Sequence, residues 1–397
     1  MIPDGWELKN LEEIGEFKNG INKSKEDFGF GVPFVNLMDV FGTSAIGKKN
    51  YALVNATQKE TQDFNLVKGD VLFIRSSVKP QGVGLTSVVI EDIENTVYSG
   101  FIIRFRPKIA IDYNFMRYCF YEQGFRLRLL SNSTISANTN INQQALNKLT
   151  LLIPPLLEQC RIAEVLGVWD ESIDLLERLI GKTRSRKQGL MQQLVTGKKR
   201  FKEFEGSEYS MVKLSEIAAT FSGGTPSRTN LEYYNGDICW IKSGELNLKN
   251  IWSTEEKITE EALKNSSAKV VSPNTILIAM YGATAGVIGI SRISAAINQA
   301  ILAIVPNDLC ANDYLFYFLQ YSMIEVIKKV QGGQPNLNAQ IIRSSSIRFP
   351  SLPEQEKIAA VLSAADEEIS TLEKQLAAYK QQKLGLMQQL LTGRIRI

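Results

Sequence analysis

The chain has 397 residues, 44% of them apolar and 22% charged, which is ordinary for a globular protein and excludes wholesale disorder. It contains no histidine, which excludes Ser-His-Asp and Cys-His nucleophilic sites, and its net charge of +3 is too small to identify a polyanionic partner. The four cysteines, Cys119, Cys160, Cys239 and Cys310, are far apart, so we expect buried small side chains rather than structural zinc or disulfides. Because no apolar run of about 18 residues and no leader-like start is present, the sequence predicts a cytoplasmic protein without a membrane span.

Residues 1–152 form the first predicted globular segment. Short β-branched runs lie between clusters of Gly, Asn and Ser, which indicates strands joined by long loops. One helix is expected near 113–130. The segment is therefore predicted to have a mixed α/β fold.

Residues 153–204 are predicted to be a long helix followed by a basic linker. Pro154 and Pro155 mark the start of the helix and Gly197 its end. The apolar period of 3.5 residues is typical of a coiled coil, and at ~1.5 Å per residue the helix would extend over roughly 55–60 Å. The seam positions expected to pack are Ile162, Leu166, Trp169, Ile173, Leu176, Leu190 and Leu194.

The second half of the chain repeats the first. The word Gly-Leu-Met-Gln-Gln-Leu at 189–194 recurs at 385–390, inside a gapless alignment of 153–197 with 349–393 in which about half of the positions are identical. Residues 205–348 match 1–152 more loosely and include a predicted helix near 312–330. We therefore expect a second globular domain at 205–348 and a second long helix at 349–397. Its seam positions are Ile358, Leu362, Ile369, Leu372, Leu386 and Leu390.

One such helix cannot bury its apolar stripe alone, so the two are expected to pair antiparallel. The predicted fold class is α+β (mixed α/β), with two pseudo-symmetric globular domains separated by two long antiparallel coiled-coil helices. Lys187 and Lys383 interrupt the two seams at matched positions and either set the register or lie at a solvated seam end. Gly189 and Gly385, which are unfavourable inside a helix, suggest a close backbone approach or a bend.

The ordered, duplicated motifs resemble a known family. They are the proline-rich entries to the helices at 153–159 and 349–355, the helix ends at 189–197 and 385–393, and the runs 222–228 and 240–246 of the second globular segment. Together they are similar to the specificity (S) subunit of type I restriction-modification systems, the HsdS family, over essentially the whole chain. The first globular segment departs from the pattern, with Lys-Asn-Gly-Ile-Asn at 18–22 where the second has its Gly-Gly-Thr-Pro run.

The resemblance implies a function and a set of partners. Residues 1–152 and 205–348 would be two target-recognition domains, each reading one half of a bipartite asymmetric site in double-stranded DNA. The helices would act as spacers and as docks for two methyltransferase (M) subunits, and restriction (R) subunits would join the complex. The chain itself would bind no cofactor or metal, because S-adenosylmethionine belongs to the M subunits, and ATP and magnesium to the R subunits.

Motifs for catalysis are missing from the sequence. It has no Asn/Asp-Pro-Pro-aromatic motif of adenine methyltransferases and no phosphate-binding Gly-x-x-x-x-Gly-Lys-Ser/Thr loop. The glycines between 282 and 289 are interpreted as a strand-to-loop turn. We therefore expect a non-catalytic subunit; adenine-N6 methylation and ATP-dependent cleavage would belong to the assembled complex.

DNA contacts are expected from basic, amide and hydroxyl side chains in loops and at strand ends, because these groups bind phosphates and base edges. Solvated or turn-capping polar residues are the alternative at every position, and Asn140, Asn142, Asn336 and Asn338 recur in both halves as structural turns would. The candidates are Lys23, Lys25, Arg75, Ser76, Lys79, Gln81, Asn138 and Asn140 in the first segment, and Thr225, Ser227, Arg228, Lys242, Ser243, Tyr281, Thr284, Gln334 and Asn336 in the second.

The first long helix and the linker after it also carry the basic residues Lys182, Arg184, Arg186 and Lys187, then Lys198, Lys199, Arg200 and Lys202. These are either a solvated helix face or a basic stripe that faces phosphates between two half-sites. The alternative to DNA recognition as a whole is a helical interaction scaffold or adaptor that binds no DNA.

Overall fold

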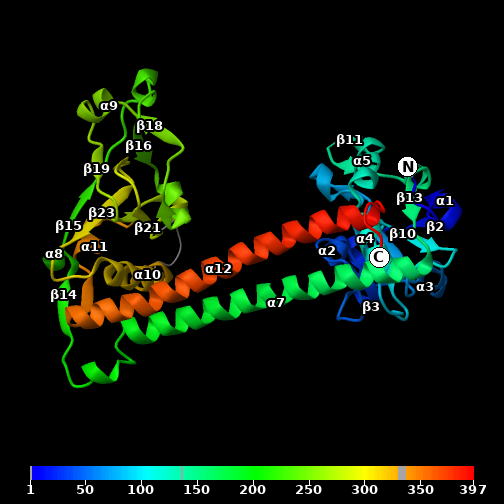
Figure 1. The fold of residues 1–397 in the computed structure, drawn as a ribbon, viewed down its shortest axis with the longest axis horizontal. Coiled ribbons are helices and arrows are strands. Elements are labelled where there is room, and N and C mark those ends of the chain that lie inside the picture. Colours follow the sequence, from blue (N-terminus) through cyan, green and yellow to red (C-terminus); the bar gives the residue numbers. More distant parts are fainter. Residues whose placement is uncertain (1, 136, 330–336) are drawn as a thin grey trace. The chain divides into compact units, whose positions relative to one another are not determined.

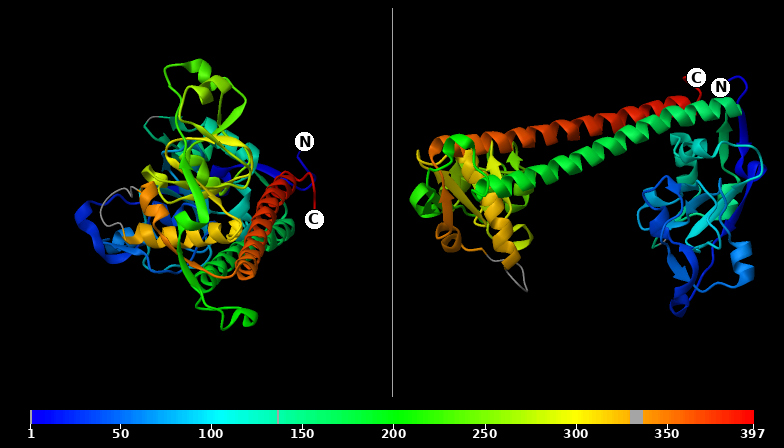
Figure 2. Two further views of the ribbon diagram at one scale, coloured as in Figure 1. Left: turned by 90° about the vertical axis from the view of Figure 1, so that its left-hand side faces the viewer. Right: turned by 90° about the horizontal axis from the view of Figure 1, so that it is seen from below.

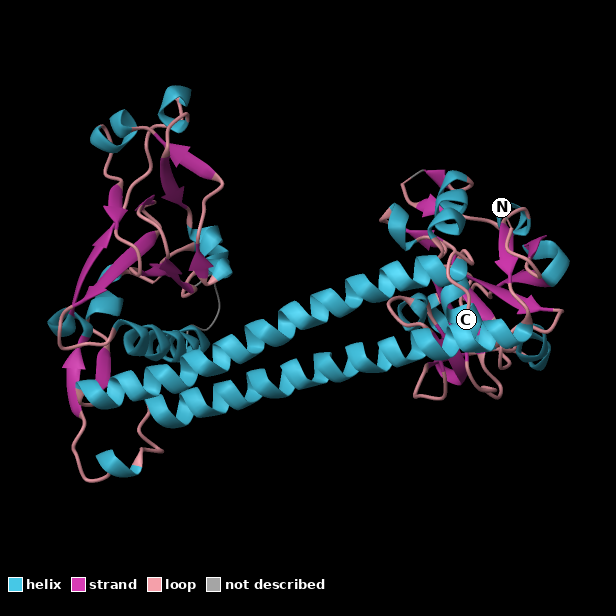
Figure 3. Cartoon of the chain, in the orientation of Figure 1, coloured by secondary structure: helices cyan, strands magenta, loops and turns pink. Residues whose placement is uncertain are grey.

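The structure, a computed structural model, describes residues 2–135, 137–329 and 337–397. The chain divides into two compact units, Met1–Glu177 with Lys374–Ile397, and Arg178–Glu373. They are called unit 1 and unit 2 (Figure 1). Each unit contains one globular domain and parts of two long helices, α7 (Leu156–Val195) and α12 (Leu352–Leu391). The predicted mixed α/β class is confirmed, because each domain combines sheets with short helices (Figure 3).

The domain of unit 1 is built on a five-stranded sheet in the order β2-β10-β6-β8-β4, whose central strand β6 is buried throughout. A ribbon of β1 and β13 and two three-stranded sheets, β5-β3-β9 and β11-β12-β7, complete the domain. Its strands are β1 (Glu7–Asn10), β2 (Gly15–Asn19), β3 (Phe28–Val35), β4 (Ala45–Ile46), β5 (Ala52–Val54), β6 (Val71–Ile74), β7 (Ser76–Ser77), β8 (Thr86–Val89), β9 (Val97–Tyr98), β10 (Ile102–Pro107), β11 (Thr134–Ile135), β12 (Thr139–Asn140) and β13 (Thr150–Ile153).

Short helices connect these strands. They are α1 (Leu11–Ile14), η1 (Lys25–Asp27), α2 (Leu37–Val40), α3 (Gln58–Asp63), η2 (Pro80–Gly82), α4 (Tyr113–Cys119), α5 (Gln123–Ser131) and α6 (Gln143–Asn147). The prediction of one helix near 113–130 is wrong, because α4 ends at Cys119 and α5 begins at Gln123. The Glu122 carboxylate accepts hydrogen bonds from the backbone N–H groups of Gly124 (2.6 Å) and Phe125 (2.6 Å), so it caps a new helix instead of continuing the old one.

Unit 2 repeats this frame. Its five-stranded sheet has the order β15-β23-β20-β21-β17, beside a four-stranded sheet β18-β16-β22-β19 and a ribbon of β14 and β24. The strands are β14 (Ser210–Lys213), β15 (Ala218–Ser222), β16 (Ile238–Ile241), β17 (Asn250–Ile251), β18 (Glu256–Ile258), β19 (Lys269–Val271), β20 (Ile276–Ala279), β21 (Ile288–Ser291), β22 (Ala295–Ile297), β23 (Ile301–Pro306) and β24 (Ser346–Phe349). The helices are η3 (Lys202–Phe204), α8 (Leu214–Ile217), η4 (Leu231–Tyr234), η5 (Ser243–Leu248), α9 (Glu260–Lys264), η6 (Gly282–Thr284), α10 (Asn312–Lys329) and α11 (Ala339–Arg343).

Helices α7 and α12 are continuous over 40 residues each. Both end as the sequence predicts: Gly197 (φ +69°) and Gly393 (φ +66°) adopt the left-handed conformation that terminates a helix. Within each unit the two helices lie side by side and antiparallel (Figure 2). No helix in the described part of the chain is both long and apolar enough to cross a bilayer.

Two expectations about small residues on these helices are corrected. A Cβ added to Gly189 or Gly385 would meet nothing within 4 Å, so these glycines do not mark a close backbone approach. Cys160 is exposed on α7, whereas Cys119 and Cys310 are buried as expected and Cys239 is partly buried.

The repeated Glu-Gln pair at the start of each long helix is buried and holds the helix to its domain. The Gln159 side chain accepts from the backbone N–H of Asp112 (2.9 Å) and donates to the Pro154 carbonyl (2.8 Å). Gln355 accepts from the backbone N–H of Ala311 (2.9 Å) and donates to the Pro350 carbonyl (2.9 Å) in the same way. The helix-start motif therefore has a tertiary role beyond favouring a first turn.

Glu158 and Glu354 receive equivalent partners. In unit 1, Glu158 accepts from the Arg396 guanidinium (2.8 Å) and the Trp6 indole (3.0 Å). In unit 2, Glu354 accepts from the Arg200 guanidinium (2.5 Å) and the Tyr209 hydroxyl (3.1 Å). Each long helix therefore begins at a buried carboxylate that is paired with an arginine from the segment following the end of the other long helix.

Candidate nucleic-acid interface

The loop after the central strand of each five-stranded sheet has the same backbone frame in both domains. In unit 1 the Gly84 N–H donates to the Ile74 carbonyl (2.7 Å), and in unit 2 the Gly286 N–H donates to the Ala279 carbonyl (2.8 Å). The loop contains six residues in unit 2 and nine in unit 1. The interpretation of the glycines near 282 as a strand-to-loop turn is confirmed, because η6 and Gly286 form this turn.

In unit 1 this loop lines a groove of about 520 Å³, here called the first-domain groove. It contains four of the predicted DNA-binding residues, Ser76, Lys79, Gln81 and Asn138. Its apolar walls, which the sequence does not predict, are formed largely by Met38, Phe41, Val78 and Phe101. No sequence pattern marks these four residues, since they come from three segments separated in the chain: α2 with its C-cap, and two loops.

The remaining candidates of unit 1 lie outside the groove. The Lys23 ammonium pairs with the Glu60 carboxylate at 2.8 Å, and Lys25 is exposed on η1. Arg75 donates to the Gly100 carbonyl (3.3 Å), and the Asn140 amide donates to the Asn138 carbonyl (2.9 Å).

Two recurring asparagines have structural roles. The Asn142 side chain accepts from the Ala145 N–H (2.8 Å) and caps α6, and Asn338 accepts from the Ile341 N–H (2.8 Å) and caps α11. The turn interpretation is therefore confirmed for this pair. Gln334 and Asn336, also predicted to bind DNA, lie outside the described residues.

In unit 2 the candidates form two groups. Tyr281 and Thr284 belong to the loop after β20, and the side chains of Thr225 and Gln299 are hydrogen-bonded to each other. Ser243 begins η5, whose first turn is closed by the Lys242 N–H donating to the Glu245 carboxylate at 2.7 Å.

The second group is a charged cluster around Glu256. The Arg228 guanidinium (2.7 Å) and the Lys242 ammonium (2.9 Å) both pair with the Glu256 carboxylate. Hydrogen bonds from Arg228 and then Lys242 lower the pKa of Glu256. Arg228 also lies over the Tyr234 ring at 4.3 Å, and Ser227 is hydrogen-bonded to Thr229 at 2.7 Å. The two basic candidates are therefore pre-oriented, and Glu256 offsets part of their charge.

The matched seam lysines each form a half-buried polar triad. In unit 2, Asp366 accepts from Lys187 (2.7 Å) and from the Tyr317 hydroxyl (2.7 Å). In unit 1, Asp170 accepts from Lys383 and from the Tyr118 hydroxyl (2.7 Å). The lysines thus connect the helix pair to the domain at equivalent points, and they do not lie at solvated seam ends.

The basic residues of α7 are also paired within unit 2. Arg184 binds Glu373 at 2.5 Å and Arg186 binds Glu368. Lys182 is exposed. Half of the predicted basic stripe, namely Arg184, Arg186, Lys187 and Arg200, is therefore paired with carboxylates of α12.

The predicted helix-packing residues are all buried or half-buried. The buried ones are Ile162, Leu166, Ile173, Leu176, Leu194, Ile358, Leu362, Ile369 and Leu390, and the half-buried ones are Trp169, Leu190, Leu372 and Leu386. Several of them pack into a domain core instead of forming a helix seam alone. Met387 and Leu390 join the core of unit 1, and Met191 and Leu194 join that of unit 2. The repeated Gly-Leu-Met-Gln-Gln-Leu word is thus a docking segment for the chain's own domains.

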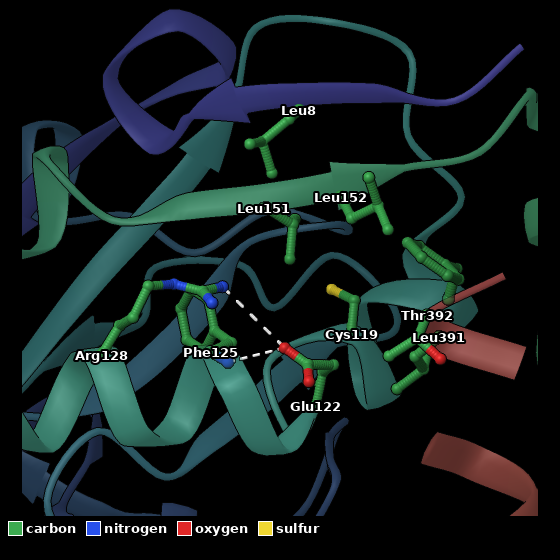
Figure 4. A pocket seen from close by; sticks show the side chains of 10 residues that line it. Leu8, Cys119, Glu122, Phe125, Arg128, Leu151, Leu152, Leu391 and Thr392 are labelled. Carbon is green, nitrogen blue, oxygen red and sulfur yellow. Dashed lines mark hydrogen bonds and ion pairs between the residues drawn. The ribbon is translucent and has the colours of Figure 1, made fainter. Parts of the chain in front are cut away.

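A cavity of about 160 Å³ lies beside this docking segment in unit 1 (Figure 4). Leu151, Phe125 and Leu391 contribute its apolar wall, and Glu122 faces Arg128 at 3.8 Å. Because Glu122 is already used as the cap of α5, the cavity is explained by packing between the domain and the helix end.

Comparison with known proteins identifies the family. The family model described as the type I restriction modification DNA specificity domain matches residues 3–182 and 206–379. The chain belongs to this family. Members of the DNA specificity family are the non-catalytic components of type I systems.

Individual relatives agree with this assignment. A Methanocaldococcus jannaschii protein, provisionally named as the specificity subunit of type I restriction enzyme MjaX, is 25% identical over 413 aligned residues, which cover 100% of this chain and 95% of the relative. The MjaIX specificity subunit of the same organism is 34% identical over 174 residues, covering 42% of this chain and 40% of the relative. The type I system S subunit from M. genitalium has the same fold, with a TM-score of 0.57 at 17% identity over 98% of this chain and 96% of the other.

Proposed function

We propose that this chain is the DNA-recognition subunit of a type I restriction-modification complex, in which each globular domain reads one half of a bipartite asymmetric site. One observation carries the proposal: the family's DNA specificity model matches both domains, and these share a backbone frame while their matched loops differ in chemistry. Loops that vary on a common scaffold are where binding specificity resides.

The residues that we propose for DNA contact are the candidates that line the first-domain groove, and the basic and loop candidates of unit 2. In unit 1 they are Ser76, Lys79, Gln81 and Asn138 in the first-domain groove, and in unit 2 Arg228, Lys242, Tyr281 and Thr284. Amide and guanidinium groups can form paired hydrogen bonds with base edges, and ammonium groups bind phosphates.

The long helices are proposed as docks for two methyltransferase subunits. In unit 1, α7 exposes Leu157 (66%), Val168 (58%) and Leu175 (63%), which lie on one helix face because close to whole numbers of helical turns separate them. Exposed apolar stripes of this kind indicate a protein partner. Adenine-N6 methylation with S-adenosylmethionine would then belong to the methyltransferase subunits, and ATP- and magnesium-dependent cleavage to restriction subunits.

Exchange of one domain tests the recognition role. Replacing 205–348 with the corresponding domain of a relative should change one half of the methylated sequence and leave the other half intact, as read by long-read sequencing of methylated genomic DNA. If both halves changed, or neither did, the two-domain reading would be wrong.

Lengthening the helices tests their role as a spacer. Seven residues inserted after Leu179 and seven after Gln375 preserve the heptad seam and should lengthen the gap between unchanged half-sites. Altered half-site bases at unchanged spacing would contradict this role.

A gel-shift assay separates recognition from the alternative of a DNA-free scaffold. The chain co-purified with a methyltransferase subunit should retard a duplex that carries the methylated sequence. A complex that forms with the methyltransferase and retards no duplex would identify the chain as an adaptor instead.

A further inference from the structure

The first-domain groove is lined by large apolar side chains that are exposed to solvent. Met38 is 74% exposed, Phe41 48%, Val78 81% and Phe101 57%, and all four line one groove. Exposed apolar side chains that gather in one groove indicate a binding site. Burying such surface against a partner is favourable by about 25 cal/mol per Å² of apolar area removed from water.

The polar side chains of the groove suit an anionic ligand. Lys79 supplies a positive charge, Gln81 and Asn138 supply amides, and Ser76 and Ser77 supply hydroxyls. Among the described residues that line the groove there is no aspartate or glutamate. The combination of apolar walls, amides and one ammonium fits a base edge beside a phosphate better than it fits a purely apolar partner.

The apolar walls are not demanded by the fold, because unit 2 builds the same backbone without them. The Arg75 N–H donates to the Phe101 carbonyl (2.9 Å), and the Met280 N–H donates to the Ala300 carbonyl (2.8 Å), so Ala300 occupies the position of Phe101.

A second pair of equivalent hydrogen bonds identifies the positions in unit 2 that correspond to Met38 and Phe41. The Asn36 N–H donates to the Asp39 carboxylate (2.9 Å) at the start of α2, as the Lys242 N–H does to Glu245 at the start of η5. Counting from these caps, Gly244 stands at the position of Met38 and Asn247 at that of Phe41. Small and polar residues of unit 2 thus stand at the positions of three large apolar residues of unit 1.

We propose that the first-domain groove reads thymine methyl groups in the half-site recognised by unit 1, with Phe41 and Phe101 contacting the methyls and Gln81 and Asn138 pairing with adenine edges. This inference rests on the proposed function and names its specificity-determining residues. The C5-methyl of thymine is the apolar group at a base edge in the major groove, and adenine presents the donor and acceptor that an amide can match. Unit 2 has no aromatic side chain at the positions of Phe41 and Phe101 and instead exposes Tyr281 in the matched loop, so it makes no methyl contacts from those two positions.

The test uses the full chain with its methyltransferase subunit and the methylated sequence obtained from genomic sequencing. The domain exchange at 205–348 assigns each half of that sequence to a unit. Each thymine of the unit 1 half is then replaced by deoxyuridine, which removes only the methyl group, and affinity is measured by fluorescence anisotropy. At least one replacement should weaken binding about fourfold, the value expected for one apolar carbon group.

A variant links the methyl group to the groove. In the double variant Phe41→Asn, Phe101→Ala the difference between thymine and deoxyuridine should disappear, while the effect of deoxyuridine in the other half-site should be the same in both proteins. Leu127→Ala is the matched control, because Leu127 is 59% exposed in the same domain but lies outside the groove, and it should keep the fourfold difference.

Several outcomes would overturn the inference and leave the proposed function standing. These are a unit 1 half-site without any A·T pair, or full affinity for every deoxyuridine duplex, or a fourfold loss that persists in the double variant. If the double variant loses binding altogether, the deoxyuridine scan on the unaltered protein still decides. A complex with no sequence preference would instead contradict the proposed function, and a groove that cross-links to the methyltransferase and not to DNA would show it to be a protein-docking surface.

Discussion

In both units an aspartate of a long helix, Asp170 in unit 1 and Asp366 in unit 2, lies between the helix pair and the globular domain, but its hydrogen-bond partners differ. Asp170 in unit 1 receives one lysine and one tyrosine, whereas Asp366 in unit 2 also receives Lys249, whose ammonium lies at 2.5 Å. The backbone register that places Lys249 in unit 2 places Ser44 in unit 1, where the Ser44 hydroxyl accepts from Arg117 at 3.0 Å. Each domain therefore places one additional basic side chain in this region, Arg117 in unit 1 and Lys249 in unit 2, and the two come from different positions in the repeat.

This difference shows what the duplication preserves. The carboxylate, the tyrosine and the lysine from the opposite helix recur, because each depends on the others for a hydrogen-bond partner in a partly buried place. The additional positive charge is present in both units but at different positions, since a basic side chain can reach the same region from several backbone positions. The following predictions use pairs of matched substitutions, one in each unit.

The largest effect is expected for Asp366→Asn. It would leave Lys187 and Lys249 facing each other without a carboxylate, and we expect a loss of about 3 kcal/mol in unit 2. Asp170→Asn removes the partner of a single lysine and should cost unit 1 about 1.5 kcal/mol. Hydrogen exchange of the amides in α10 and in α4 measures the two units separately. Equal losses in both units would show that Lys249 contributes nothing.

A smaller difference is expected at the arginines that bind the helix starts. Arg200 is 16% exposed in its pair with the fully buried Glu354, whereas Arg396 is 44% exposed in its pair with Glu158. Arg200→Ala should therefore destabilise unit 2 by about 2 kcal/mol, and Arg396→Ala should destabilise unit 1 by less, because the more exposed pair is better screened by water. Exchange of amides in the first turns of α12 and α7 is the readout, and a larger loss for Arg396→Ala would contradict the ranking.

Acid should weaken unit 2 through Asp366. Burial opposes ionisation of Asp366, but hydrogen bonds from Lys187, Lys249 and Tyr317 outweigh it and lower its pKa. The folded state therefore binds fewer protons than the unfolded state, so this stabilisation is fully present above the unfolded value of about 3.9 and is lost as pH falls through the folded pKa. The stability difference between the unaltered protein and Asp366→Asn should shrink below about pH 4. A difference that stayed constant from pH 7 to pH 3 would exclude Asp366 as its source.

The smallest effect is expected at the matched glycines of the long helices. Neither Gly189 nor Gly385 has a neighbour that an added Cβ would meet, so Gly189→Ala and Gly385→Ala should each stabilise the helix by up to about 1 kcal/mol. Thermal unfolding of the isolated chain measures this gain. If either alanine weakens binding of the methyltransferase subunit, the bare backbone at that glycine is a contact for the partner.

Much of the frame is predictable from local pattern. The long helices, their ends at Gly197 and Gly393, and the duplication follow from heptad spacing, left-handed glycine and sequence identity, all of which act over short distances in the chain. The split between α4 and α5 was missed because a single glutamate side chain captures two backbone N–H groups, and residue periodicity does not report such a capture.

The candidate interface is predictable only in part, because residue patterns do not report which side chains tertiary packing leaves exposed. Lys79, Gln81 and Asn138 could be proposed because polar loop residues are candidates wherever they occur. Phe41 and Phe101 could not, since an aromatic residue in a sequence is as readily a core residue, and packing decides which of the two it becomes. Local chemistry was sufficient for the duplicated scaffold; the partners of Glu158 and Asp366, and the exposure of the groove's apolar walls, depend on contacts between residues distant in the chain.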